Sequence, residues 1–64
     1  MPWNAETLKR LREGRRLTQQ QLAERIGAHR VTIAKLETGA LRPGVDTLEA
    51  LAKALKVKVT ELLK

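Results

Sequence analysis

The stretch from Thr18 to Gly39, TQQQLAERIGAHRVTIAKLETG, constrains the fold of this chain more than any other part of the sequence. It contains two short amphipathic helical patterns separated by Gly27, and the small residue Ala23 lies one turn before that glycine. Glycine adopts a left-handed backbone without a Cβ clash, so Gly27 can end the first helix and turn the chain sharply. The stretch therefore predicts two helices that cross closely at a tight turn.

The N-terminal residues predict a further helix over about 5–15. Asn4 is a good N-cap, because its side chain can accept a hydrogen bond from the first turn. Trp3 and Leu8 have the N′ to N4 spacing of a hydrophobic staple, which would fix how the chain enters this helix. The alternative is that Trp3 is exposed and anchors an interface, a common role for tryptophan.

The two helices of the central stretch have recognisable boundaries. Thr18 and Gln21 form the T-x-x-Q pattern of a capping box, which predicts the start of the first one. The second is expected over about 30–37, with His29 at its N-cap and Gly39 after its end.

Two elements follow this pair of helices. Apolar residues recur with helical spacing between Leu48 and Leu55, and either Gly44 or Asp46 can cap this fourth helix, which should extend to about residue 56. A short helix or turn over about 59–63 is expected to add its apolar residues to the core.

Length and composition narrow the class of protein. Sixty-four residues make one small domain, 1–64, and the pattern predicts an all-α fold of five short helices with a helix-turn-helix over about 18–39. The chain has one His and no Ser, Cys or Tyr, so neither a Ser or Cys triad nor a multi-His metal site can be assembled. We expect no catalysis, no metal and no cofactor.

Charge points to the kind of partner. No apolar run approaches the roughly 18 residues of a membrane span, and the N-terminus lacks the apolar core of a signal peptide, so we expect a soluble, cytoplasmic protein without membrane contact. A net charge of +6 favours a polyanion such as nucleic acid, although a solvated basic surface would carry the same charge. Residues 1–42 hold nine Lys or Arg against four Glu, whereas 43–64 hold four Lys against three acidic residues, so most of the excess lies in the half with the helix-turn-helix.

The segments LTQQQLAERIGAHRVTIAKLETGALRP and TLEALAKALKVKVTELL closely resemble the phage repressor, Cro and xenobiotic-response-element (XRE) family of helix-turn-helix regulators. The resemblance covers about residues 8–63. It implies a lambda-repressor-like fold that binds double-stranded DNA with a recognition helix, about 29–38, in the major groove. The chain would be a transcriptional regulator or repressor, or an isolated or engineered DNA-binding domain. The matching positions are Leu17-Thr18-Gln19, Leu22-Ala23, Gly27, Ile33, Leu36-Glu37, Gly39, Arg42-Pro43 and the Leu48 to Leu55 repeat.

The resemblance implies that five residues of the recognition helix read bases, namely His29, Arg30, Val31, Ala34 and Lys35. Arg30 can pair with O6 and N7 of guanine, and Val31 can meet a thymine methyl group. Lys35 can reach guanine or a phosphate. A merely solvated helix face would more often carry Glu and Gln than Val31 and Ala34.

Other residues are implied as contacts to the DNA backbone. Gln19 opens the second helix, and helix N-termini attract anions. The full set is Thr18, Gln19, Gln20, Thr32, Thr38, Arg42 and Arg16. In the family an Arg of the first helix often pairs with the Glu near the end of the third, so Arg12 and Glu37 are implied as a structural bridge rather than as DNA contacts.

The sequence departs from the family pattern at four positions. Arg16 and Lys56 stand where the family often has Gly, so both are expected to adopt a positive φ that is uncommon for such residues. His29 replaces the usual Ser or Thr cap of the third helix, and Lys58 replaces a similar cap near the C-terminus. These departures bear on local stability more than on function.

Two questions stay open at the level of sequence. The same fold can serve as a protein-interaction module, such as an antitoxin or a bridging coactivator, but the absence of acidic residues over 29–35 favours DNA. A homodimer on paired half-sites and a monomer are both compatible with the chain. The apolar residues Val57, Val59, Leu62 and Leu63 are candidates for a dimer surface, and core filling explains them equally well.

Overall fold

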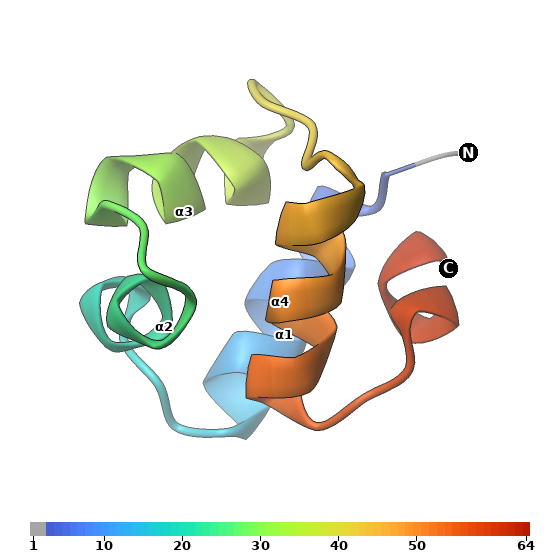
Figure 1. The fold of residues 1–64 in the computed structure, drawn as a ribbon, viewed down its shortest axis with the longest axis horizontal. Helices are drawn as coiled ribbons and strands as arrows, with labels where there is room; N and C mark the ends of the chain where they lie inside the picture. Colours follow the sequence, from blue (N-terminus) through green and yellow to red (C-terminus); the bar gives the residue numbers. More distant parts are fainter. Residues whose placement is uncertain (1–2) are drawn as a thin grey trace.

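A computed structural model describes residues 3–64 (Figure 1). Its elements are α1 (Ala5–Gly14), α2 (Gln19–Ile26), α3 (Arg30–Thr38), α4 (Val45–Leu55) and the 3-10 helix η1 (Val59–Leu63). The all-α prediction is confirmed, and no strand occurs within residues 3–64. The count of five short helices was wrong, because the chain has four α-helices within residues 3–64 and the last element is a 3-10 helix. Five residues are too few for several i to i−4 hydrogen bonds, whereas short segments commonly form 3-10 turns.

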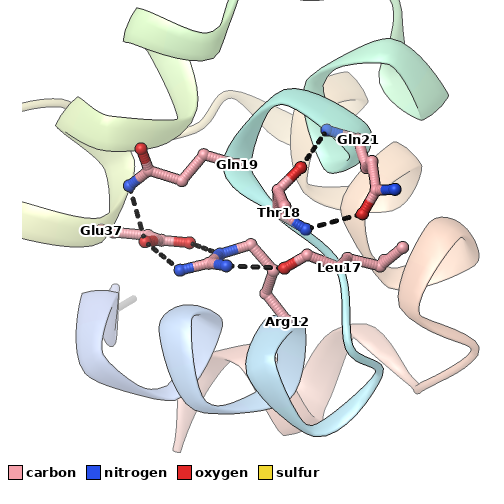
Figure 2. Close-up of polar contacts among 6 residues, drawn as sticks. All are labelled: Arg12, Leu17, Thr18, Gln19, Gln21 and Glu37. Carbon is pink, nitrogen blue, oxygen red and sulfur yellow. Dashed lines mark hydrogen bonds and ion pairs between the residues drawn. The ribbon is translucent and has the colours of Figure 1, made fainter.

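The first two helices begin at the predicted caps. The Asn4 side chain accepts a hydrogen bond from the Thr7 amide at 3.1 Å. The Thr18 hydroxyl accepts from the Gln21 amide at 3.0 Å, and the Gln21 side chain accepts from the Thr18 amide at 2.9 Å (Figure 2). This reciprocal pair is the capping box that the sequence predicted, and it fixes the N-terminus of α2.

The other two helices begin without a side-chain cap. His29 and Gly44 hold the N-cap positions of α3 and α4 in extended conformations, and neither supplies a side-chain hydrogen bond. Asp46 lies within the first turn of α4, where its charge suits the helix dipole. The alternative start at Asp46 is therefore wrong.

A residue with a left-handed backbone follows each α-helix within two positions. Gly27 (φ 69°) and Gly39 (φ 82°) follow α2 and α3, whereas Arg16 (φ 57°) and Lys56 (φ 58°) follow α1 and α4. The expectation of positive φ at the last two residues is confirmed. The predicted ends of α1, α3 and α4 differ from the observed ends by one residue each.

The core lies between the four helices and η1. Ala23 of α2 and Ile33 of α3 are both fully buried in it, so a larger side chain at position 23 would push α2 away from α3. The buried apolar residues are Leu8, Leu17, Leu22, Ala23, Ile33, Leu36, Leu48, Leu51, Ala52, Leu55 and Leu62.

The N-terminal segment is tied to two distant parts of the chain. Trp3 is half-buried against the core, and its indole Nε1 donates to the Leu36 carbonyl of α3 at 2.9 Å. The Asn4 side-chain amide donates to the carbonyl of Lys64. Figure 1 shows the segment before α1 and the helix η1 on the same side of the molecule. Trp3 therefore belongs to the fold, and the alternative of an exposed interface anchor was wrong.

The C-terminal apolar residues fill the core. Leu62 is fully buried, and Val57, Val59 and Leu63 are partly buried and pack against the same cluster. Of the two explanations left open by the sequence, core filling accounts for these side chains. Within residues 3–64, none of the helices combines the length and the apolar character needed to cross a membrane.

Candidate nucleic-acid interface

The outer face of α3 presents a mixture of cationic and apolar side chains. Arg30, Val31 and Lys35 are exposed, and Val31 keeps 52% of its surface accessible although it is a large apolar residue. Ala34 lies half-buried on the same helix, while Ile33 and Leu36 face the core. An exposed valine next to two cations suits contact with a surface that carries both charge and methyl groups.

The cations of this face have no internal partner among residues 3–64. The ion pairs in that range are Arg12 with Glu37 and Lys64 with Glu61, so neither Arg30 nor Lys35 is neutralised by a carboxylate. The exposed His29 precedes them at the N-cap of α3 and leaves the first amides of the helix without a side-chain acceptor. The N-terminal half of α3 is thus an unpaired, positively charged surface.

The α2 N-terminus supplies further donors. The Gln19 side-chain amide donates to Glu37 Oε1 at 3.1 Å, and because an amide carries two N–H groups, one remains free. The Thr18 hydroxyl only accepts, from the Gln21 amide, so its own proton is available. Gln20 is exposed but donates to the Glu24 carboxylate at 3.1 Å, which places a negative charge beside it.

A buried ion pair holds α1 against α3 below this surface. Arg12 Nε donates to Glu37 Oε2 at 2.6 Å, and Nη2 donates to Oε1 at 3.2 Å (Figure 2). The third nitrogen, Nη1, donates to the Leu17 carbonyl at 2.6 Å. The two side chains are 10% and 3% exposed. This fork geometry satisfies the guanidinium in three directions and joins α1, α3 and the α1–α2 connection.

Gln19 of α2 also contacts the Arg12–Glu37 pair, through a hydrogen bond from its side-chain amide. Its amide meets the same Glu37 carboxylate that Arg12 holds, so three helices converge on one buried acid (Figure 2). The hydrogen bond and charge of Glu37 raise the pKa of Arg12, against the opposing effect of burial. The Arg12–Glu37 pair was implied by the family resemblance, whereas the role of Gln19 in it was not, since no local pattern signals a contact across 18 positions.

The remaining predicted contact residues differ in their freedom to bind. Thr38 donates its hydroxyl proton to the Lys35 carbonyl at 3.2 Å, so its donor is already used. Thr32 is half-buried on α3, and Arg42 is exposed in the loop that follows this helix. Arg16 lies on the connection between α1 and α2, and Figure 1 shows this connection along the lower edge of the molecule, with α3 at the upper left. The other predicted residues lie on α3, at the α2 N-terminus and in the loop after α3, whereas Arg16 lies on the α1–α2 connection, two residues before Thr18.

Other kinds of site find no support in the described part of the chain. Within residues 3–64, no group of three or more His, Asp or Glu side chains could hold a metal ion. The hollow lined by Glu6, Lys9, Arg10 and Glu13 lies on the outer side of α1 and is formed by exposed charged side chains.

Comparison with known proteins identifies the family. A helix-turn-helix family model matches residues 8–62. The chain is 41% identical over 58 residues to the HTH-type transcriptional activator BcrR of Enterococcus faecalis, covering 91% of this chain and 28% of that protein. It is 41% identical over 59 residues to the control protein C.SmaI of Serratia marcescens, covering 92% and 70% respectively. The chain belongs to the helix-turn-helix family of phage repressors, Cro proteins and XRE regulators.

Solved structures share the fold. The P22 c2 repressor, crystallised in complex with a synthetic operator, superposes with a TM-score of 0.91 at 28% identity, over all of this chain and 97% of that one. The restriction-modification controller C.AhdI of Aeromonas hydrophila gives 0.87 at 29% identity, over 91% and 88%. The chain spans between 28% and 52% of the length of the first three curated relatives, so those proteins contain segments that this sequence lacks.

Proposed function

We propose that this protein binds double-stranded DNA in a sequence-specific manner and thereby regulates transcription. The observation that carries the proposal is the outer face of α3, where exposed Val31 lies among cations that have no carboxylate partner in residues 3–64. Phosphates attract such cations, and base edges in the major groove offer acceptors to Arg and methyl groups to Val. The similarity to a repressor crystallised with its operator supports the same docking.

The proposed roles follow from position on the helices. Arg30 and Lys35 pair with guanine or with phosphate, Val31 meets a thymine methyl, and His29 and Ala34 lie against the neighbouring base edges. The free N–H of Gln19 and the hydroxyl of Thr18 bind a phosphate at the N-terminus of α2, and Gln20, Thr32, Thr38 and Arg42 lie along the flanking backbone.

The buried Arg12–Glu37–Gln19 group couples the two parts of this interface. The same carboxylate that fixes α3 also orients the glutamine that faces a phosphate, so the distance between the base-reading and phosphate-binding parts is held by one contact group. Such a rigid spacing favours one register on the duplex, because phosphate contacts position the protein while base contacts specify the sequence.

Selection of bound duplexes from a random library tests the proposal. We expect enrichment of a defined motif, and paired copies of it if the protein binds as a homodimer on half-sites. Affinity should fall steeply with salt, with a slope of about −0.9 in log–log form for each phosphate neutralised. Failure to enrich any motif, combined with pull-down of a protein partner at high salt, would instead support an antitoxin or coactivator role. A DNA-binding regulator would work in the compartment that holds the DNA, which for a bacterial cell is the cytoplasm.

A further inference from the structure

A second group of cations lies at the end of the molecule away from α3. The C-terminal ends of α1 and α4 are neighbours there, because Arg15 Nη2 donates to the Lys56 carbonyl at 3.5 Å. Figure 1 shows both helix ends along the lower edge, with α3 at the upper left. The exposed basic residues of these ends, which we call the rear basic surface, are Arg15, Arg16, Lys53, Lys56 and Lys58.

The positive charge of the rear basic surface is not neutralised within residues 3–64. None of its five side chains takes part in an ion pair in that range. The acidic residues nearest to it along the two helices are Glu13 and Glu49, since Glu6 and Asp46 lie in the first turns of α1 and α4, so cations outnumber carboxylates there. The carbonyl groups at the ends of α1 and α4 explain a preference for some positive charge, but they do not require a residue with a side chain at the left-handed positions.

The backbone hydrogen bonds after α1 and α4 do not depend on a cationic side chain at position 16 or 56. The Leu17 amide donates to the Arg12 carbonyl at 3.2 Å after α1, and the Val57 amide donates to the Ala52 carbonyl at 2.9 Å after α4. The same pattern follows α2, where the left-handed residue is Gly27. Glycine suits this conformation better than any residue with a Cβ.

Arg16 and Lys56 therefore hold strained positions that glycine would fill with less strain, and both add charge to the same surface. Two such substitutions on separate helices, brought together in space, indicate that the charge itself has a use. A surface on which cations outnumber carboxylates suits a polyanion.

We propose that the rear basic surface binds the phosphate backbone of a second DNA duplex, so that one domain bridges two duplexes. This inference rests on the proposed function, since the first duplex is the one held by α3. Among residues 3–64, the large apolar side chains that remain exposed are Val31, Leu41 and Val45, and none of these three belongs to the rear basic surface. Protein interfaces usually centre on apolar or aromatic anchors, whereas binding to a phosphate backbone needs only charge. The surface thus suits DNA better than an acidic protein.

A two-duplex capture assay tests the proposal. Beads carry the duplex recovered by library selection, the protein is added at about 50 mM salt, where phosphate contacts are strong, and a labelled duplex of unrelated sequence follows. Retained protein and retained label are measured separately. We expect the wild-type protein to retain both. Absence of protein on the beads would refute the proposed function, whereas bound protein without captured label would refute only the bridging.

The double variant Lys56→Gly/Lys58→Gln removes two charges from the rear basic surface and relieves one left-handed side-chain position, so it should remain folded with an unchanged or raised Tm. We expect it to stay on the beads and to capture the second duplex about tenfold or more less well, with a salt slope about 1.8 shallower, because two phosphate contacts are lost.

The matched control is Lys9→Gln/Arg10→Gln, which removes the same charge from the exposed outer side of α1. It should capture the second duplex as the wild type does. Equal capture of the second duplex by the wild type and the glycine variant would overturn the proposal, since capture would then not depend on the rear basic surface. Equal loss in the glycine variant and the control would also overturn it, because only net charge would matter. Retention of an acidic protein with no capture of duplex would assign the surface to a protein partner.

Discussion

At both ends of this molecule, α-helices are followed by a residue with a left-handed backbone. At the α3 end this residue is glycine, whereas at the rear end it is a cationic residue. Gly27 and Gly39 frame α3, whereas Arg16 and Lys56 hold nearly the same backbone angles after α1 and α4. The α3 end combines unpaired cations with exposed Val31, and the rear end carries cations without an apolar partner. Reading bases requires directed hydrogen bonds and methyl contacts, while holding a phosphate backbone requires only charge. Positive charge at the two ends therefore suits two different kinds of binding, base reading at α3 and backbone binding at the rear basic surface.

The largest loss of stability is expected at the Arg12–Glu37 ion pair, which holds α3 against α1. Glu37→Gln leaves the buried guanidinium of Arg12 without its counter-charge, and loss of one partner of a buried pair costs about 3–5 kcal/mol. We expect a drop of this size in the free energy of unfolding by urea, which would leave the small domain largely unfolded at moderate temperature. The control is Glu61→Gln, which breaks the exposed pair with Lys64 and should cost less than about 1 kcal/mol. Similar losses in the two variants would show that burial does not strengthen the Arg12–Glu37 pair.

The two ends should respond differently to loss of one charge when DNA binding is measured. Arg30→Ala removes a base contact, so we expect the preference for the selected duplex over random sequence to fall by about 1–3 kcal/mol. Arg16→Gly should leave that ratio as it is, because the rear basic surface contacts phosphates only. Competition titrations with selected and random duplexes give both ratios. An equal fall in the two variants would remove the distinction between the two ends.

Substitutions at two residues with a left-handed backbone, Gly27 and Arg16, should change the stability of the domain in opposite directions. Gly27→Ala places a side chain at φ 69°, where nothing lies within 4 Å of the added Cβ, so any cost comes from the backbone alone. We expect a loss of about 1–2 kcal/mol in thermal or urea unfolding, the usual penalty for an L-residue in this conformation. Arg16→Gly reverses that change at the other end and should be neutral or stabilising.

The control for this comparison is Gly14→Ala within α1, where the added Cβ also meets nothing within 4 Å and φ is not left-handed. It should stabilise the domain by up to about 1 kcal/mol, because alanine is the better helix former. A loss of stability in both alanine variants would show that backbone handedness is not the cause.

The smallest of these effects concerns the N-terminal segment that reaches α3. Trp3→Phe keeps most of the apolar contact with the core but removes the hydrogen bond from Nε1 to the Leu36 carbonyl. The expected cost is about 1 kcal/mol, the usual net contribution of one such bond. Hydrogen exchange at the C-terminal half of α3 should increase more than exchange in α2. Uniform acceleration across the domain would indicate that Trp3 supports the core rather than α3 in particular.

Local sequence was sufficient for most of the elements and their ends. The Thr18–Gln21 capping box, the Asn4 cap and the left-handed Gly27 each depend on residues within a few positions of one another. Such hydrogen bonds form whenever the helix forms, so their residues can be recognised in the chain. The last element was predicted as a fifth helix because its apolar spacing does not distinguish an α-helix from a 3-10 turn. The base-reading residues were named from the resemblance together with helical periodicity, and their roles remain proposals.

The contacts between distant segments depend on how the helices cross. Gln19 and Glu37 are in contact because the chain turns at Gly27 and packs α2 against α3. Trp3 contacts Leu36 because the N-terminal segment passes beside α3. The connection that carries Arg16 illustrates the same limit, since the residue's charge is read from the sequence and its positive φ was implied by the family resemblance, but the place of this connection in the fold follows from neither. Periodicity identifies which face of a helix is buried, whereas the packing of the core selects the neighbour that each face meets.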